Sequence, residues 1–466
     1  MRLYLIIHYI LILVSIFIVI FKKNKVNDII VLFIASFDSI PIIYFGNSAS
    51  GGIFLADIIL GILLLKTILY RRHILNSYIN KKMNVINGVF IVWIILCTVL
   101  SVTRELPIQT AYSLTTYSKF TVYGLVRVIS YVIYMVIFFS YVLIKKEKKE
   151  LLNKLFIILL IFCVFLILNQ SEIINLSGIE SLGNRIQHTM EILNKDFNSQ
   201  IFLGTNKPNL GAVCYTIFWY FIYFLFKKEK VKTIYFLPIS ISFIALLGTQ
   251  SRSDVLALII SLMFFTFITN KKMHKIIIKV AIGISYISIV ALCIVFLFNI
   301  NIKGEGLEYY VKSILFIERG VGSAGYRILL YESTLKFLLS NPIIMLLGLG
   351  PNCFRMLFGF ENITTNFGHN TYLHNVAELG IIGAVIMAIM FIKLLLVIKR
   401  IIKKDCVFEF SCIIAFFIGR MVAGISVDTF FAVDTMLTSN IMLIGFIAIV
   451  YMTTETNYIS KGELNE

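Results

Sequence analysis

The chain has 466 residues, of which 59% are hydrophobic and 14% are charged, and its formal net charge is +17. Soluble domains are roughly 45–50% apolar and about 25% charged, so this composition excludes an ordinary soluble enzyme and predicts a polytopic membrane protein. Most of the excess charge is lysine in short loops, which does not indicate nucleic-acid binding. The cysteines lie mainly inside apolar runs, so no disulfide framework is expected.

The apolar runs predict an all-α fold with about 12–14 transmembrane helices. The first run, 3–21, has no small-residue cleavage site and precedes the basic KKNK, so we expect a retained helix rather than a signal peptide. The predicted spans are 3–21, 28–45, 53–70, 85–102, 122–144, 151–169, 209–226, 233–249, 254–269, 276–300, 379–398, 406–427 and 435–453.

The loops between these spans alternate in charge. The short, lysine-rich loops begin at Lys22, Arg71, Lys145, Lys227, Asn270 and Lys399. The loops at Gly46, Thr103, Gln170, Gln250, Asn301 and Asp428 are poorer in lysine or much longer. The positive-inside rule therefore predicts that the lysine-rich loops are cytoplasmic and that the other loops face the extracytoplasmic side.

Two outer loops are long, 170–208 and 301–378, and long loops in compact proteins are usually functional. The second contains YRILLYESTLKFLLSN, which ends at Asn341-Pro342 and predicts an amphipathic helix. Its apolar positions are Leu329, Leu330, Leu335 and Leu338. The pattern leaves open whether this helix lies in the outer leaflet or on the protein surface.

Three parts are expected along the chain. Residues 1–208 form N-terminal transmembrane helices with the first long outer loop. Residues 209–453 form a transmembrane core with the outer loop 301–378, and residues 454–466 form a cytoplasmic tail.

Four arginines are predicted near the outer side of the membrane. Arg252 lies at the boundary, Arg127 and Arg420 lie roughly 9–12 Å deeper at 1.5 Å per residue, and Arg327 lies on the large outer loop. Guanidinium groups bind phosphate bidentately and stay protonated, so the four could form a site for a lipid diphosphate. The alternative is that each arginine only extends toward the membrane surface or pairs with a buried acid such as Asp38 or Asp57. Lys66, near the inner end of its span, is expected to extend toward the membrane surface.

The stretch FGHNTYLHNVAELGIIG places polar residues directly before the span 379–398. His369 is a candidate general base there, since histidine titrates near neutral pH. A metal site of His369, His374 and Glu378 is the competing interpretation. On a helix Glu378 would lie on the opposite face from His369, so closure around a metal is disfavoured and a bond between His374 and Glu378 is preferred. The chain also has no Asp-x-Asp pair, which disfavours a metal-dependent nucleotide-sugar transferase.

This stretch resembles the signature of the O-antigen ligase and O-antigen polymerase superfamily, His-Asn followed by nine residues and Gly-x-x-Gly. The matching positions are His369, Asn370, Gly380 and Gly383. Two further features of the superfamily resemble this chain. One is Arg-x-x-x-Leu at Arg252, although Ser253 and Asp254 depart from the small residues usual there and Asp254 could pair with Arg252. The other is Arg327 ahead of the turn 348–352. The resemblance covers about residues 205–450.

The resemblance implies a transfer of glycan from undecaprenyl diphosphate to an acceptor sugar without a metal or other cofactor. It implies that Arg252 and Arg327 bind the diphosphate. Arg420 and Arg127 are further candidates because of their predicted position near the outer side of the membrane. His369 would activate the acceptor hydroxyl and Asn370 would orient it. Gly380 and Gly383 would allow close helix packing that holds His369. The implied location is the bacterial inner membrane with the site on the extracytoplasmic face. The implied partners are membrane lipids, a chain-length regulator and a flippase.

Within the superfamily no motif separates a polymerase of lipid-linked repeat units from a ligase that moves finished glycan to a lipid A core or another acceptor. A polymerase is favoured because polymerases are the more variable group. Two non-enzymatic alternatives are a lipid-linked oligosaccharide flippase, which would need a polar cavity through both leaflets, and a membrane scaffold, in which the signature would be coincidental.

Overall fold

A computed structural model describes residues 2–21, 25–35, 41–44, 52–70, 78–103, 114–142, 148–170, 207–227, 236–249, 251–269, 322–357, 360, 361, 363, 368–401 and 407–426. Its helices are α1 (Arg2–Phe21), α2 (Lys25–Ala35), α3 (Leu55–Tyr70), α5 (Tyr78–Thr103), α6 (Leu114–Val142), α7 (Lys148–Gln170), α9 (Lys207–Lys227), α10 (Phe236–Gly248), α11 (Arg252–Ile268), α14 (Gly322–Ser340), α15 (Pro342–Leu347), the 3-10 helix η3 (Phe354–Leu357), α16 (Thr371–Ile401) and α17 (Val407–Ala423). The predicted spans 276–300 and 435–453, most of the outer loop 170–208, Asp38 and the tail 454–466 lie outside the described residues.

The second predicted span, 28–45, was wrong in its outer half. The helix α2 ends at Ala35, and a two-stranded antiparallel hairpin follows, made of β1 (Pro41–Tyr44) and β2 (Gly52–Phe54). Pro41 lacks a backbone N–H and disfavours helix in the residue before it, while Ile42 and Ile43 are β-branched and favour a strand. The other predicted spans that fall within the described residues coincide largely with helices.

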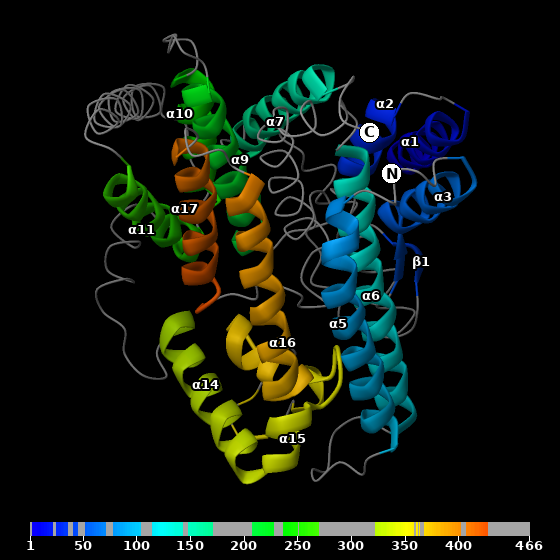
Figure 1. The fold of residues 1–466 in the computed structure, drawn as a ribbon, viewed down its shortest axis with the longest axis vertical. Helices are drawn as coiled ribbons and strands as arrows, with labels where there is room; N and C mark the ends of the chain where they lie inside the picture. Colours follow the sequence, from blue (N-terminus) through cyan, green and yellow to red (C-terminus); the bar gives the residue numbers. More distant parts are fainter. Residues whose placement is uncertain are drawn as a thin grey trace, which may run out of the picture.

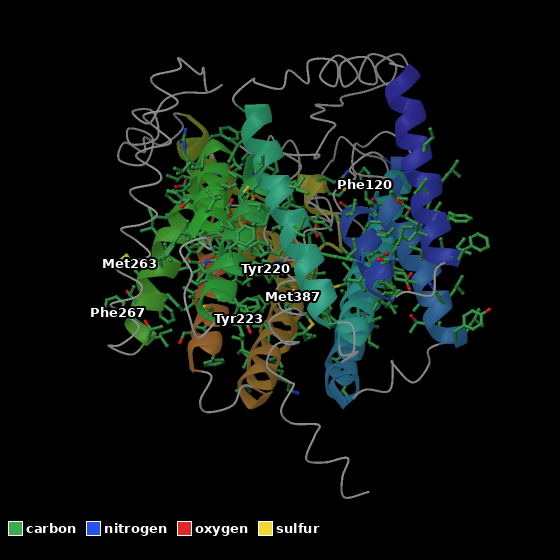
Figure 2. All side chains as sticks on the ribbon, turned by 90° about the horizontal axis from the view of Figure 1, so that it is seen from above. Phe120, Tyr220, Tyr223, Met263, Phe267 and Met387 are labelled. Carbon is green, nitrogen blue, oxygen red and sulfur yellow. The ribbon has the colours of Figure 1, made fainter. Side chains whose placement is uncertain are left out.

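One helical stretch among the described residues, Thr371–Lys393, is both long enough and apolar enough to cross a membrane, judged by length and composition. Shorter apolar helical stretches are Ile12–Phe21, Gly88–Thr103, Phe120–Ser130, Lys154–Val164, Gly211–Tyr223, Phe236–Gly248 and Phe410–Ala423. Large apolar side chains also point outward from the body; Phe267 of α11 is 82% exposed (Figure 2). These helices are consistent with insertion in a membrane, where apolar surface meets lipid.

The helices form two groups on either side of α16 (Figure 1). α17 lies between α11 and α16, while α5 and α6 pack together on the other side of α16. α14 and α15 lie across one end of the molecule, where α16 begins. The C-terminal part of α5 and the N-terminal part of α6 also lie near this end of the molecule. There the turn at Gly350 and Pro351 packs against Ser101 of α5 and Gly124 of α6.

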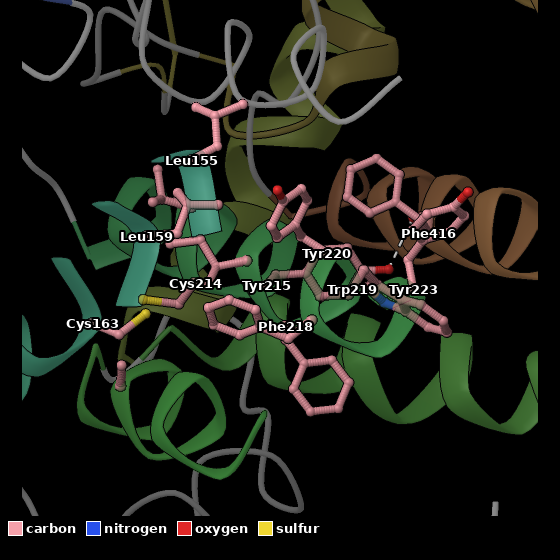
Figure 3. Close-up of a cluster of buried hydrophobic side chains, with 14 of the residues drawn as sticks. Leu155, Leu159, Cys163, Cys214, Tyr215, Phe218, Trp219, Tyr220, Tyr223 and Phe416 are labelled. Carbon is pink, nitrogen blue, oxygen red and sulfur yellow. Dashed lines mark hydrogen bonds between the residues drawn. The ribbon is translucent and has the colours of Figure 1, made fainter. Parts of the chain in front are cut away.

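The largest buried cluster surrounds α9 and is rich in aromatic rings (Figure 3). Trp219 packs edge-on against Phe265 of α11, and the Tyr215 hydroxyl donates to the carbonyl of Phe416 in α17 at 2.9 Å. Large aromatic side chains bury much surface and lose few rotamers, so they fix α9, α11 and α17 relative to one another.

The predicted amphipathic helix is α14, and it ends at Ser340 before Asn341-Pro342, as predicted. It has a core of its own at the end of the molecule: Leu330 and Leu338 are buried with Phe354 of η3. Leu335, placed on the same apolar face from the sequence, is instead 47% exposed. α14 is thus a packed element that also presents apolar side chains outward.

Candidate functional site

His369 lies in a tight turn directly before α16. Its φ angle is 49°, in the left-handed region that is uncommon for a residue with a side chain. The hydroxyl of Tyr331, on α14, donates to the His369 carbonyl at 2.7 Å. His369 is partly exposed, so this residue lies at the border of the protein with its backbone carbonyl bound to α14.

Asn370 caps α16. Its side-chain Oδ1 accepts hydrogen bonds from the backbone N–H groups of Tyr372 at 3.0 Å and Leu373 at 3.1 Å. Asparagine is a preferred N-cap because its side-chain oxygen satisfies donors that the helix leaves unpaired. The oxygen is therefore occupied by the helix, and any contact with an acceptor would use Nδ2.

Two hydrogen bonds join the start of α16 to the end of α17 and the turn that follows it, and a third contact joins α14 to the same turn. Thr371 N–H donates to the carbonyl of Gly424 at 2.8 Å, and the Tyr372 hydroxyl donates to Met421 at 2.8 Å. The Tyr331 hydroxyl, which binds His369, also lies 3.1 Å from the carbonyl of Ile425. These bonds couple the position of His369 to α14 and α17.

Arg420 forms a buried ion pair with Asp254 of α11. Ser251 also donates to Asp254, at 2.5 Å, and the Arg420 guanidinium lies 5.7 Å from the centre of the Tyr215 ring. Asp254 was considered as a partner for Arg252; the structure shows it bound to Arg420. Arg252 lies two residues from this pair, at the first position of α11, and is partly exposed.

Arg127 is bound by a carboxylate in the other group of helices. Its Nη1 lies 2.7 Å from Asp57 Oδ1 of α3, and its Nε donates to the Tyr123 hydroxyl at 2.7 Å. Pairing with Asp57 was the alternative considered from the sequence, and the structure confirms it. Lys66 was expected to extend toward the membrane surface, but it binds Asp28 at 3.0 Å and the Val19 carbonyl at 2.7 Å.

Arg327 lies on α14 one helical turn before Tyr331, and both side chains are partly exposed. Residues four apart in a helix share a face, so Arg327 lies on the face that carries the Tyr331 hydroxyl to His369. The structure thus brings Arg327, His369 and the end of α17 to one end of the molecule. The Arg127–Asp57 pair instead joins α3 to α6.

His374 and Glu378 are buried together on α16, with Nε2 of the histidine 3.2 Å from Oε1 of the glutamate. This confirms the preferred pairing. Glu378 also accepts the backbone N–H groups of Asn352 at 2.9 Å and Phe354 at 3.0 Å. Across the described part of the chain, no group of three or more His, Cys, Asp or Glu side chains is placed to hold a metal ion.

Gly380 interrupts α16 with φ 70° and ψ 174°. The carbonyls that this break frees find donors outside the helix: Leu349 and Gly350 donate to Ala377 and Glu378, both at 2.8 Å, and the Trp93 indole donates to Leu379 at 3.0 Å. A side chain at Gly380 would collide with the Leu346 carbonyl, and one at Gly383 would lie 2.6 Å from Trp93 Nε1. The two signature glycines therefore permit close packing of α15 and α5 against α16.

Sequence reasoning did not single out Arg355, Tyr331 or Trp93. Arg355 is buried on η3, donates to Asn352 Oδ1 at 2.9 Å and lies 4.5 Å from the centre of the Phe120 ring. Burial, aided by the Glu378 carboxylate, raises the pKa of the nearby Cys353 thiol well above its usual value, so that thiol stays neutral. Tyr331 could have been suspected from its spacing of four from Arg327.

Residues 237–388 match the family model described as O-antigen ligase. The matched region contains Arg252, Arg327, His369, Asn370 and both signature glycines; Arg127 and Arg420 lie outside it. A search of curated proteins found no match.

Proposed function

Since the region 237–388 belongs to the O-antigen ligase and polymerase superfamily, whose members are integral membrane proteins, we propose that this protein is a membrane glycosyltransferase that uses a polyprenyl-diphosphate-linked glycan donor. Its proposed reaction joins undecaprenyl-diphosphate-linked repeat units into a surface polysaccharide, an O-antigen or a capsule. The proposed location is the bacterial inner membrane, with the site on the extracytoplasmic face.

The chemistry needs an acceptor hydroxyl, a base and a good leaving group. The acceptor oxygen attacks the anomeric carbon of the donor sugar and forms the new glycosidic bond. The bond from that carbon to the diphosphate oxygen breaks, and the lipid diphosphate leaves with the electron pair. His369 takes the hydroxyl proton, a role that suits an imidazole near neutral pH. No metal is needed in this scheme, because fixed guanidinium groups stabilise the charge on the leaving diphosphate.

One observation carries the proposal: His369 is held in a strained turn by Tyr331, on the same helix face as Arg327. Backbone strain of this kind costs about 1–3 kcal/mol and persists where surrounding contacts fix it, commonly at functional sites. The turn also lies at the start of the apolar stretch Thr371–Lys393. A base there could reach an aqueous acceptor while the donor's lipid stays in the membrane.

We propose two different roles for the four arginines. Arg420 and Arg127 each bind a carboxylate within the helical body, so their charges are largely neutralised there. We assign the diphosphate to Arg252 and Arg327, which are partly exposed and lie in the family-matched region. Arg420 then supports the site by holding the end of α17.

The test is synthesis by the purified protein in proteoliposomes. Lipid-linked repeat units extracted from the native host should be converted into ladders of longer lipid-linked chains. His369→Ala should abolish the ladder at an unchanged amount of protein. His8→Ala on α1 is the matched control and should leave the ladder unchanged. A full ladder with His369→Ala would refute the catalytic assignment.

Lysine variants test the two proposed diphosphate ligands. Arg252→Lys and Arg327→Lys keep the charge but lose the bidentate fork, and charge-assisted bonds contribute about 1.5–3 kcal/mol. We expect donor kcat/KM to fall by about 10- to 100-fold in each variant. An unchanged kcat/KM would remove that arginine from the site.

A ligase is the second candidate, because the matching family model is described as O-antigen ligase. A ligase would move finished glycan from the lipid diphosphate to lipid A core or another acceptor. Supplying lipid A core together with polymerised donor distinguishes the two: glycan appearing only on the core identifies a ligase, and longer lipid-linked chains without the core identify a polymerase.

A further inference from the structure

The ring of His374 connects the turn at His369 to a buried carboxylate. Gly368 N–H, directly before His369, donates to His374 Nδ1 at 3.2 Å. The other ring nitrogen, Nε2, lies 3.2 Å from Glu378 Oε1. Phe354 stacks on the ring, with centroids 5.1 Å apart and planes 10° apart. The ring is buried, with a hydrogen bond at Nδ1, the Glu378 carboxylate beside Nε2 and Phe354 on one face.

The direction of the Gly368 hydrogen bond assigns the proton on this ring. A backbone N–H can donate only to an unprotonated nitrogen, so the neutral ring carries its proton on Nε2, which faces the carboxylate. A carboxylate beside one nitrogen of a histidine fixes both the tautomer and the orientation of the ring. Glu378 therefore keeps Nδ1 available as the acceptor for the turn.

Glu378 is itself fixed by a second segment. Its two carboxylate oxygens accept the N–H groups of Asn352 and Phe354, at 2.9 and 3.0 Å. The same segment is wedged against α5 and α6, since Gly350 lies against Ser101 and Gly124 lies against Pro351. Contacts thus run without a break from α5 and α6 through Glu378 and His374 to the turn.

We propose that His374 and Glu378 are a positioning pair that sets the turn at Gly368 and His369, and through it the direction of the His369 ring. This inference rests on the proposed function. The turn needs such support, because the left-handed φ of His369 is unfavourable. Such a conformation persists where contacts with the surrounding structure maintain it. Gly368 lies so close to the ring that an added Cβ would be 2.9 Å from the Cβ of His374.

A small displacement of the base should be costly. A misplacement of about 1 Å can lower a rate by about 100-fold, because the reacting atoms must meet at near-contact distance. His374 and Glu378 touch no reacting atom in this scheme, so their loss should lower kcat and leave the donor KM nearly unchanged.

Two substitutions divide the functions of the His374 ring. In His374→Asn, the side-chain oxygen can take the position of Nδ1 and accept Gly368 N–H, but the side chain is too short for Glu378. In His374→Gln, the amide can reach Glu378 but leaves the turn without its acceptor. The asparagine variant should be the less stable of the two, since it leaves a buried carboxylate with one fewer partner.

The experiment measures kcat, donor KM and thermal stability for both variants in proteoliposomes with extracted lipid-linked repeat units. We expect His374→Gln to lose at least about tenfold in kcat with donor KM within about twofold, and His374→Asn to retain more of the rate despite its lower stability. Activity that follows stability instead, with the glutamine variant the faster enzyme, would overturn the positioning role.

His369→Ala in the same assay separates this inference from the proposed function. If His369→Ala stays active, the base assignment fails and the positioning role fails with it. If His369→Ala is inactive while His374→Gln keeps the full rate, only the positioning inference is overturned.

Discussion

Two Arg–Asp pairs in two regions of the molecule share the same chemistry but have different surroundings. Arg127 and Asp57 join α6 to α3 in the N-terminal group, and Arg420 and Asp254 join α17 to α11 in the C-terminal group. The first pair lies within the helical body of its group. The second lies one turn before carbonyls that bind Thr371 and Tyr331.

The difference shows that a charge inside an apolar segment does not identify its own role. An ionisable group in a membrane span is a functional hypothesis by default. Here both arginines have a carboxylate partner, so the charge alone does not separate them. Their surroundings separate them: the Arg420 pair lies one turn before the carbonyls that Thr371 and Tyr331 bind, whereas the Arg127 pair joins α6 to α3.

The largest expected effect is the loss of stability when the arginine of one pair is replaced. Arg420→Met leaves Asp254 buried, and loss of one member of a buried pair costs about 3–5 kcal/mol. Arg127→Met should cost less, because the Asp57 side chain is 17% exposed whereas that of Asp254 is 0% exposed. Thermal unfolding of the two variants in detergent checks this order. Equal destabilisation would remove the distinction between the two sites.

Replacing both members of a pair tests whether the Arg420 pair supports the site and the Arg127 pair does not. Well-packed apolar replacements of a buried pair are often neutral in stability, so both double variants should fold. Arg127→Met with Asp57→Leu should keep chain synthesis within about twofold of the wild type. Arg420→Met with Asp254→Leu should lower kcat by at least about tenfold, because the end of α17 loses its fixed position. A fully active second double variant would show that Arg420 does not support the site.

A matched pair of tyrosine hydroxyls gives a smaller effect. Tyr331→Phe removes the bond to the His369 carbonyl, and Tyr123→Phe removes the bond from Arg127. Each loss should destabilise by about 1 kcal/mol, the usual net contribution of one hydrogen bond. Only Tyr331→Phe should also lower kcat, by about threefold to tenfold. The prediction fails if the two variants have the same kcat.

Periodicity and helix-ending residues predicted much of the fold. The spans coincide with helices because apolar runs of that length are helical in a membrane. The end of α14 was predicted because Pro342 restricts the residue before it. The hairpin β1–β2 was missed because the apolar run of Ile42, Ile43 and Tyr44 fits the end of a helical span as well as it fits a strand.

For the candidate site, the sequence indicated which residues to consider but not most of the contacts that those residues make. The pairing of His374 with Glu378 followed from helical spacing and is confirmed. His369 and the two glycines were singled out by the resemblance to the superfamily signature, and their roles stay predictions. The partner of Arg420 and the backbone partners of Glu378 could not be predicted, because Asp254 lies 166 positions from Arg420 and Asn352 lies 26 from Glu378. Such contacts depend on packing in three dimensions, and helical periodicity contains no information about them.

Asn370 offers the smallest and most local test, since its side chain could cap α16, orient an acceptor, or do both. Asn370→Ser keeps an oxygen that can accept the N–H groups of Tyr372 and Leu373, whereas Asn370→Ala removes it. The alanine variant should lose about 1 kcal/mol of stability and the serine variant only a few tenths. Because serine retains the cap but has no amide, acceptor KM separates the two roles. If Asn370 only caps the helix, Asn370→Ser should have the wild-type acceptor KM, and the start of α16 would then hold His369 without touching the acceptor. A raised acceptor KM in the serine variant, at unchanged stability, would instead show that Nδ2 binds the acceptor.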